Sequence, residues 1–240
     1  MKFLRWIPLG LLLVPMSAHA ITFTLDTVNG GYNYKATADF SVVAGRLQVV
    51  LTNTQTSGAP TNAQVFTGVF FSIPGALSGG TAAMTAGSTL VGSNPFGSDT
   101  VAQHWAYKNG TPSPSFFSGV TQGIGTAGFG FYGPTDAFQS GGQNPVLDGV
   151  DFGMVGNALN GASTQPFVFN SMTFTFDLPT PGFEANSTTI RNVWFQYGSD
   201  FSEFQGFDPE FPPGGDPVPE PTAMAMVAFT AAAIWARRKK

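Results

Sequence analysis

Apolar and polar side chains alternate with a period of two residues over several stretches of the chain. The clearest stretch is 32–42, whose apolar set is Tyr32, Tyr34, Ala36, Ala38, Phe40 and Val42. Successive side chains of a strand point to opposite faces, so this pattern predicts a half-buried strand. The same alternation predicts strands over 21–25, 45–51, 171–178 and 192–198. A more continuously apolar run, 65–73, predicts a strand that is covered on both faces.

Turn-forming residues separate these segments, as in Asn29-Gly30-Gly31 and Pro74-Gly75. The 30 glycines and 18 prolines make long helices unfavourable. Many short strands joined by such turns are typical of an all-β fold, and we expect one antiparallel β-sandwich, jelly-roll-like, over residues 21–201. The stretch 78–165 is rich in Gly, Ser and Asn and predicts long loops.

The N-terminal segment has the three parts of a secretory signal peptide. Two cations, Lys2 and Arg5, precede an apolar run, and the small residues Ala18 and Ala20 follow it. We therefore expect residues 1–20 to direct export through the Sec machinery and signal peptidase to cleave after Ala20.

Removing the termini changes the charge of the chain. The whole sequence has a formal charge of −4, but residues 21–218 hold four cations against thirteen acids, a balance of −9. An acidic body without a basic patch argues against nucleic acid as a partner, because that affinity depends on neutralising phosphates.

The C-terminal segment changes character twice. Residues 202–218 are acidic and rich in Pro and Gly, which predicts an extended, poorly packed stem. The uncharged stretch 222–236 would form a helix about 22 Å long, short for a hydrocarbon core of about 30 Å. Four cations end the chain and would stay cytoplasmic: Arg237, Arg238, Lys239 and Lys240. We expect one short transmembrane helix.

Candidate chemistry in the body is sparse. Cysteine is absent, and His104 is the one histidine left once the signal peptide is removed, so we expect no metal site and no cofactor. A G-x-G-x-x-G match at Gly123, Gly125 and Gly128 is followed by FGFYGP, which does not begin a stable helix. We interpret it as a glycine-rich β-turn region and not as a dinucleotide site.

Two weaker possibilities come from acids and aromatic residues. Asp148 and Asp151 offer oxygen ligands for Ca²⁺, with ordinary solvated turn acids as the alternative. Exposed aromatic rings stack on sugars, which makes Trp105 and Tyr107 candidate sugar-binding residues, together with Tyr132 and Trp194. Packing in the core is the alternative for each. A secreted glycoside hydrolase would need two carboxylates close in space, and the sequence does not indicate which two acids would be neighbours.

The last 22 residues resemble one known family feature. Pro219-Glu220-Pro221, the short apolar span and the basic end together are similar to the PEP-CTERM sorting signal of exosortase substrates in Gram-negative bacteria. The resemblance implies export, a transient stay in the inner membrane, processing by exosortase near the triplet, and delivery to the cell surface or extracellular matrix.

The body is also similar, more loosely, to a group of exosortase-dependent surface proteins. The segments that carry this similarity are LQVVLTNT, VFTGVFFSIPG, HWAYK, GFGFYG and NVWFQYG. We therefore expect a non-catalytic surface or matrix protein associated with exopolysaccharide and biofilm, not an enzyme. A lectin-like carbohydrate-binding module is the alternative, and a secreted hydrolase is the third hypothesis.

Overall fold

The computed structural model describes most of the body of the chain. The described residues are 20–56, 61–111, 119–128, 131–133, 135–141, 149–156, 165–199 and 204–208. The predicted signal peptide up to residue 19, the later part of the stem and the sorting signal lie outside them. Within the described residues, no helix has the length and apolar character needed to cross a membrane, and the predicted span 222–236 is not among them.

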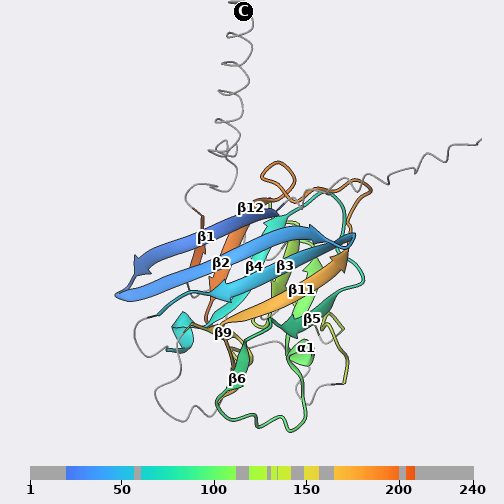
Figure 1. The fold of residues 1–240 in the computed structure, drawn as a ribbon. Helices are drawn as coiled ribbons and strands as arrows, with labels where there is room; N and C mark the ends of the chain where they lie inside the picture. Colours follow the sequence, from blue (N-terminus) through green and yellow to red (C-terminus); the bar gives the residue numbers. More distant parts are fainter. Residues whose placement is uncertain are drawn as a thin grey trace, which may run out of the picture.

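A five-stranded antiparallel sheet forms one layer of the body (Figure 1). Its order is β1 (Ala20–Asn29), β2 (Tyr32–Val43), β3 (Arg46–Asn53), β11 (Ser171–Asp177) and β5 (Thr81–Met84). Every neighbouring pair is antiparallel. The predicted alternation is confirmed in β1, β2, β3 and β11. In β2, for example, the apolar set points into the core from Tyr34 to Phe40 while the polar set does not.

The second sheet is mixed and more irregular. Its order is β13 (Gln205–Phe207), β12 (Arg191–Tyr197), β4 (Phe66–Ser72), β9 (Met154–Val155), β10 (Phe167–Phe169) and β6 (Thr89–Val91). Two further strands extend from β4: β8 (Gln122–Gly125) pairs with β4, and β7 (Ala106–Asn109) pairs with β8. The pair β9–β10 is parallel, while the other pairs are antiparallel. Two short helical turns, η1 (Asn62–Gln64) and α1 (Val101–His104), complete the fold.

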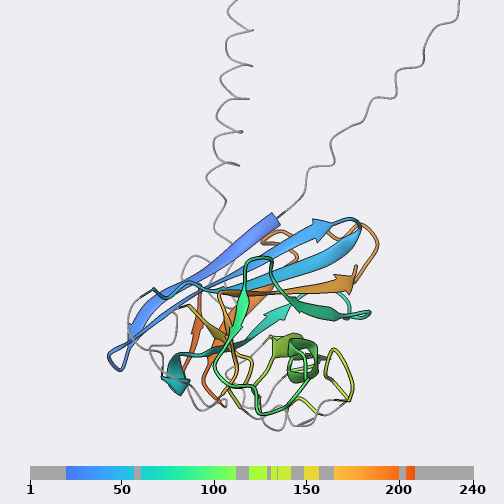
Figure 2. The ribbon, with the colours of Figure 1, turned by 60° about the horizontal axis from the view of Figure 1, so that its bottom comes forward.

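The core lies between the two sheets, which pack as layers (Figure 2). Phe40 of β2 contacts Phe71 of β4 edge to face, with 5.0 Å between ring centroids, and so joins the layers. Strand β4 is buried from Phe66 to Phe71, which confirms the prediction of a strand covered on both faces. The fold is mostly β and sandwich-like, as the sequence predicts.

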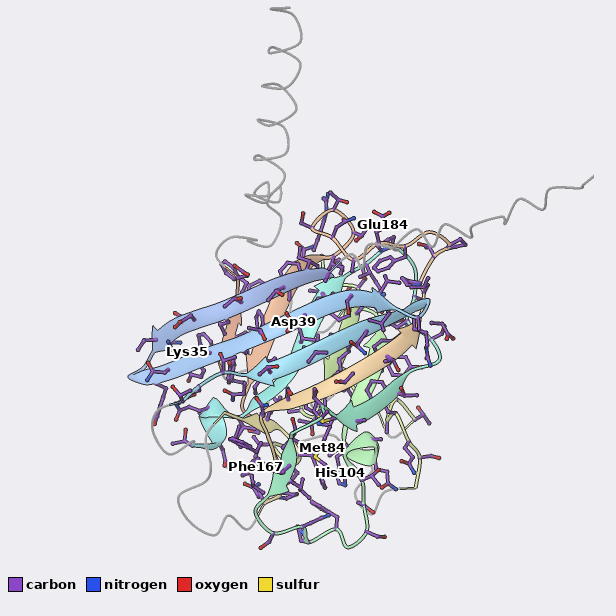
Figure 3. The ribbon with its side chains drawn as sticks, viewed as in Figure 1. Lys35, Asp39, Met84, His104, Phe167 and Glu184 are labelled. Carbon is purple, nitrogen blue, oxygen red and sulfur yellow. The ribbon has the colours of Figure 1, made fainter. Side chains whose placement is uncertain are left out.

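The outer face of the five-stranded sheet is polar and faces solvent. Figure 3 shows Lys35 and Asp39 of β2 on this face. Lys35 pairs with Asp26 of β1 at 2.8 Å, and Asp39 accepts a hydrogen bond from the hydroxyl of Thr22. These side chains account for the polar half of the alternating pattern.

Two-residue turns set the register of the first three strands. Gly30 and Gly31 join β1 to β2, with φ of 58° and 82°, as the right-handed twist of a tight hairpin requires. The turn between β2 and β3 is Ala44-Gly45, and Ala44 has a φ of 50°. The second turn therefore places an alanine in the left-handed region that glycine adopts more readily.

Three sequence predictions need correction. The sheet order β1-β2-β3-β11 is not that of a jelly roll, whose Greek keys return the fourth strand to the first, because β11 lies beside β3. The packed body does not end at residue 201, because β13 pairs with β12 and Asp208 is buried. The described parts of the stretch 78–165 contain five short strands and α1 in addition to loops.

Candidate functional site

A hollow of about 410 Å³ lies beside β7. It is formed by three segments: the residue before β5, the last three residues of β7, and the turn 135–138. The lining residues are Gly80, Tyr107, Lys108, Asn109, Thr135, Asp136, Ala137 and Phe138. Aromatic, charged and amide side chains therefore meet at one place on the surface.

The aromatic wall of the hollow is fixed by packing. The ring of Tyr107 lies 5.0 Å from that of Phe138 and 5.1 Å from that of Phe176, between centroids. Gly80 sits against the edges of these rings, and a Cβ there would be 2.7 Å from Cε1 of Tyr107. The rings close over Gly80 because it has no side chain, and the Tyr107 ring stays half-buried.

The polar wall is built around Asp136. Its Oδ2 accepts a hydrogen bond from the backbone N–H of Gly133 at 2.8 Å and lies 3.2 Å from Nζ of Lys108. Lys108 also donates to the carbonyl of Phe131 at 2.5 Å, and its ammonium lies 5.4 Å from the centre of that ring. Among the described residues, Asp136 Oδ1 makes no hydrogen bond, so one carboxylate oxygen is held and the other is available to a ligand.

Asn109 shapes the rim of the hollow. Its Oδ1 accepts from the Leu77 N–H at 2.7 Å, and its Nδ2 donates to the Leu77 carbonyl at 3.1 Å. Both polar atoms of this amide are therefore already hydrogen-bonded to the loop before β5. What remains for a ligand is an aromatic ring, one carboxylate oxygen and the exposed residue Thr135.

The prediction of Trp105 as a sugar-binding residue is wrong. Its side chain is fully buried and donates through Nε1 to the carbonyl of Phe152 at 2.9 Å, with its ring 5.0 Å from Phe174. Tyr132 is also buried, and Trp194 packs edge to face against Phe207 at 5.2 Å. Of the four aromatic candidates, Tyr107 alone lines the hollow, next in sequence to Lys108.

His104 is a packed histidine, 4% exposed. Figure 3 shows it at α1, below the five-stranded sheet. Its ring stacks on Phe152 at 4.2 Å, and Nε2 lies 3.1 Å from Oδ2 of Asp99. Burial lowers the pKa of His104 below 6.5, although the hydrogen bond and charge of Asp99 and the charge of Asp151 oppose that shift. The ring is therefore neutral at neutral pH.

Two further sequence motifs, the glycine motif and the Asp148/Asp151 pair, lie wholly or partly within the described residues. Gly123 and Gly125 lie in β8, a buried strand of the sheet, and not in the β-turn region that the sequence suggested. At both positions, neighbouring aromatic rings occupy the space where a side chain would lie. Among the described residues, no group of three or more His, Asp or Glu could hold a metal ion. Asp148, the other half of the predicted Ca²⁺ pair, lies outside them, so that hypothesis stays a prediction.

The predicted processing residues lie almost entirely outside the described part of the chain. These are Ala18 of the signal peptide, Pro219, Glu220 and Pro221 of the triplet, and Arg237, Arg238, Lys239 and Lys240. Ala20 is the exception and is the first residue of β1.

Comparisons with known proteins identify no relative. No family model matches the chain, and neither a curated protein nor a solved structure matches it. Function must therefore be inferred from the residues and their geometry. Sequence reasoning missed Asp136 and Phe138, and the turn-forming sequence GPTDAF (133–138) was the signal that could have suggested them.

Proposed function

We propose that this protein is an exported, non-catalytic surface or extracellular-matrix protein that exosortase sorts in a Gram-negative bacterium. The observation that carries the proposal is the position of the first core residue. β1 begins at Ala20, and among the described residues Ile21 is the first with a buried side chain, paired with Phe40 of β2. Cleavage after Ala20 would remove the signal peptide and leave every described core residue in place.

The sorting signal supplies the second part of the proposal. Pro219 and Pro221 restrict the backbone on both sides of Glu220, which favours an extended presentation of that carboxylate to an enzyme groove. The apolar span 222–236 and the basic end would hold the precursor in the inner membrane until exosortase acts. The partners are then signal peptidase, the Sec machinery and exosortase, and the destination is the cell surface or a biofilm matrix containing exopolysaccharide.

The non-catalytic role is supported by what surrounds the titratable side chains of the body. His104 is enclosed by aromatic rings and paired with Asp99. The lining of the hollow contributes one carboxylate, Asp136, whereas glycoside hydrolysis uses two.

Processing in the native host tests the proposal. We expect the intact mass of the mature wild-type protein to correspond to an N-terminus at Ile21 and to the loss of the basic end. Glu220→Ala should leave the precursor with its C-terminal segment attached, whereas the matched change Glu210→Ala in the stem should be processed normally. Unchanged processing of Glu220→Ala would contradict the role given to the triplet.

Carbohydrate binding is a second candidate function, and the hollow is the observation that favours it. Tyr107 supplies an aromatic ring and Asp136 a fixed acceptor, the two kinds of group that hold a sugar ring. Host exopolysaccharide should retain the wild-type protein in a pull-down and release Tyr107→Ala. Tyr32→Ala is the matched control, because Tyr32 is 41% exposed on the β1–β2 hairpin.

A further inference from the structure

We propose that the hollow beside β7 binds a neutral sugar residue and discriminates against sugar acids, an inference that rests on the second candidate function above. The sugar would stack on Tyr107 and donate a hydroxyl hydrogen to Oδ1 of Asp136. Three features carry this assignment: a fixed ring, a fixed carboxylate acceptor, and a lining cation that is already paired.

The Tyr107 ring is oriented before any ligand arrives. Phe138 and Phe176 pack against it, and Gly80 contacts its edge without a side chain of its own. A ring held in this way loses little side-chain freedom on binding, which is the general advantage of a preorganised site. The C–H face of a sugar ring is the apolar surface that such a ring accommodates.

Asp136 is fixed in the same manner. The Gly133 N–H and the Lys108 ammonium both hold Oδ2, so the carboxylate cannot turn away from the hollow without losing two contacts. An ionised carboxylate only accepts hydrogen bonds, and sugar hydroxyls are donors. A ligand carboxylate at the same place would bring two anions together in a partly buried site, which is unfavourable.

Lys108, the cation in the lining of the hollow, is already paired, and so is Arg46, which lies near Gly79 outside that lining. Lys108 contacts Asp136, the Phe131 carbonyl and the face of the Phe131 ring. Arg46 lies 3.6 Å from Asp177 and also donates to the carbonyl of Gly79, the residue next to Gly80. The body as a whole has a formal balance of −9 over residues 21–218, which adds long-range repulsion of polyanions.

Calorimetric titration of the full-length chain in a mild non-ionic detergent tests the proposal. The neutral probes are the hexamers of β-glucose, α-glucose, mannose and galactose, and the acidic probes are the hexamers of galacturonate and mannuronate. Measurements at about 0.15 M salt limit the long-range repulsion, so that the contacts in the hollow decide the outcome. We expect at least one neutral hexamer to bind and both acidic hexamers to bind more weakly.

Three variants locate the binding. Tyr107→Ala and Asp136→Asn should each weaken the neutral hexamer about tenfold, the first through lost stacking and the second through a lost charged acceptor. Tyr32→Ala should not change it. Because Tyr107→Ala removes packing, thermal melts of all variants accompany the titrations, and Asp136→Asn provides the test that leaves the ring in place.

The contrary outcomes separate the two claims. Tighter binding of an acidic hexamer would overturn the neutral-sugar assignment and leave carbohydrate binding standing. Neutral binding that neither variant weakens would overturn the location. Failure of every hexamer to bind would overturn both this inference and the second candidate function, while exosortase sorting would be unaffected because the mass measurement tests it separately.

Discussion

The carboxylate of Asp208 accepts a hydrogen bond from the backbone N–H of Thr24, with 2.6 Å between Oδ2 and N. Thr24 lies in β1, an edge strand whose other side pairs with β2. Asp208 follows β13, and Gly206 of that strand packs against the Leu25 side chain. The last described residue of the body thus holds the first strand against the second sheet.

Replacing Asp208 should therefore destabilise the whole body. Asp208→Ala leaves the Thr24 N–H without its acceptor at a site where Asp208 is only 5% exposed, so we expect a loss of about 1–3 kcal/mol in the free energy of unfolding. Urea denaturation measures it. Asp26→Ala is the control, because its ion pair with Lys35 is exposed and such pairs contribute about 0–1 kcal/mol. Equal losses in the two variants would contradict the role of Asp208.

Replacing Gln196, in contrast, should stabilise the protein. Its side chain is fully buried in β12, and among the described residues neither Oε1 nor Nε2 has a hydrogen-bond partner. Gln196→Met keeps the shape and removes the unpaired polar atoms, so it should raise the free energy of unfolding by about 1 kcal/mol.

Gln64 provides the matched control for Gln196. It is also buried, but its Oε1 accepts from the Thr61 N–H and its Nε2 donates to the Asn33 carbonyl. Gln64→Met should therefore destabilise the protein in the same urea experiment. A loss of stability in both variants would show that the Gln196 amide is hydrogen-bonded in solution.

Gly123 of β8 should not tolerate a side chain. A Cβ at this position would lie 2.7 Å from Cε1 of Phe70 and 2.8 Å from Cε1 of Phe131, inside the aromatic layer on the second sheet. We expect Gly123→Ala to lower the melting temperature through overpacking, at a cost of about 1–3 kcal/mol. Gly149→Ala is the control, since its nearest neighbour would be 3.8 Å away; a comparable effect there would argue against overpacking.

Four of the five strands of the first sheet could be predicted because each has one buried and one solvated face, whereas the short edge strand β5 has no buried face. Apolar and polar residues therefore alternate along β1, β2, β3 and β11. The glycine pair Gly30-Gly31 marks the turn between β1 and β2. Strand β8 has no such signal. Its sequence is QGIG and it is buried on both faces, so its glycines suggested a turn and its place between β4 and β7 was missed.

The site was less predictable than the fold, because it depends on contacts between distant segments. Trp105 and Tyr107 share one face of an alternating segment and look equivalent in sequence, yet the first enters the core and the second lines the hollow. Asp136 is brought to Lys108 by a turn that no periodic pattern marks. Gln205–Phe207 looked like stem because three residues carry no measurable period, and pairing with β12 alone makes them a strand.

The buried histidine predicts how stability depends on pH. Burial lowers the pKa of His104 below its ordinary value of 6.5, so the unfolded chain binds a proton near pH 6.5 while the folded protein stays neutral there. Stability is then fully present above pH 6.5 and declines as the pH falls below it. Urea midpoints between about pH 8 and about pH 5 measure the effect, and His104→Gln should flatten this part of the profile. His104 is the only histidine after the signal peptide, so an unchanged slope in the variant would show that carboxylates, and not this ring, set the dependence.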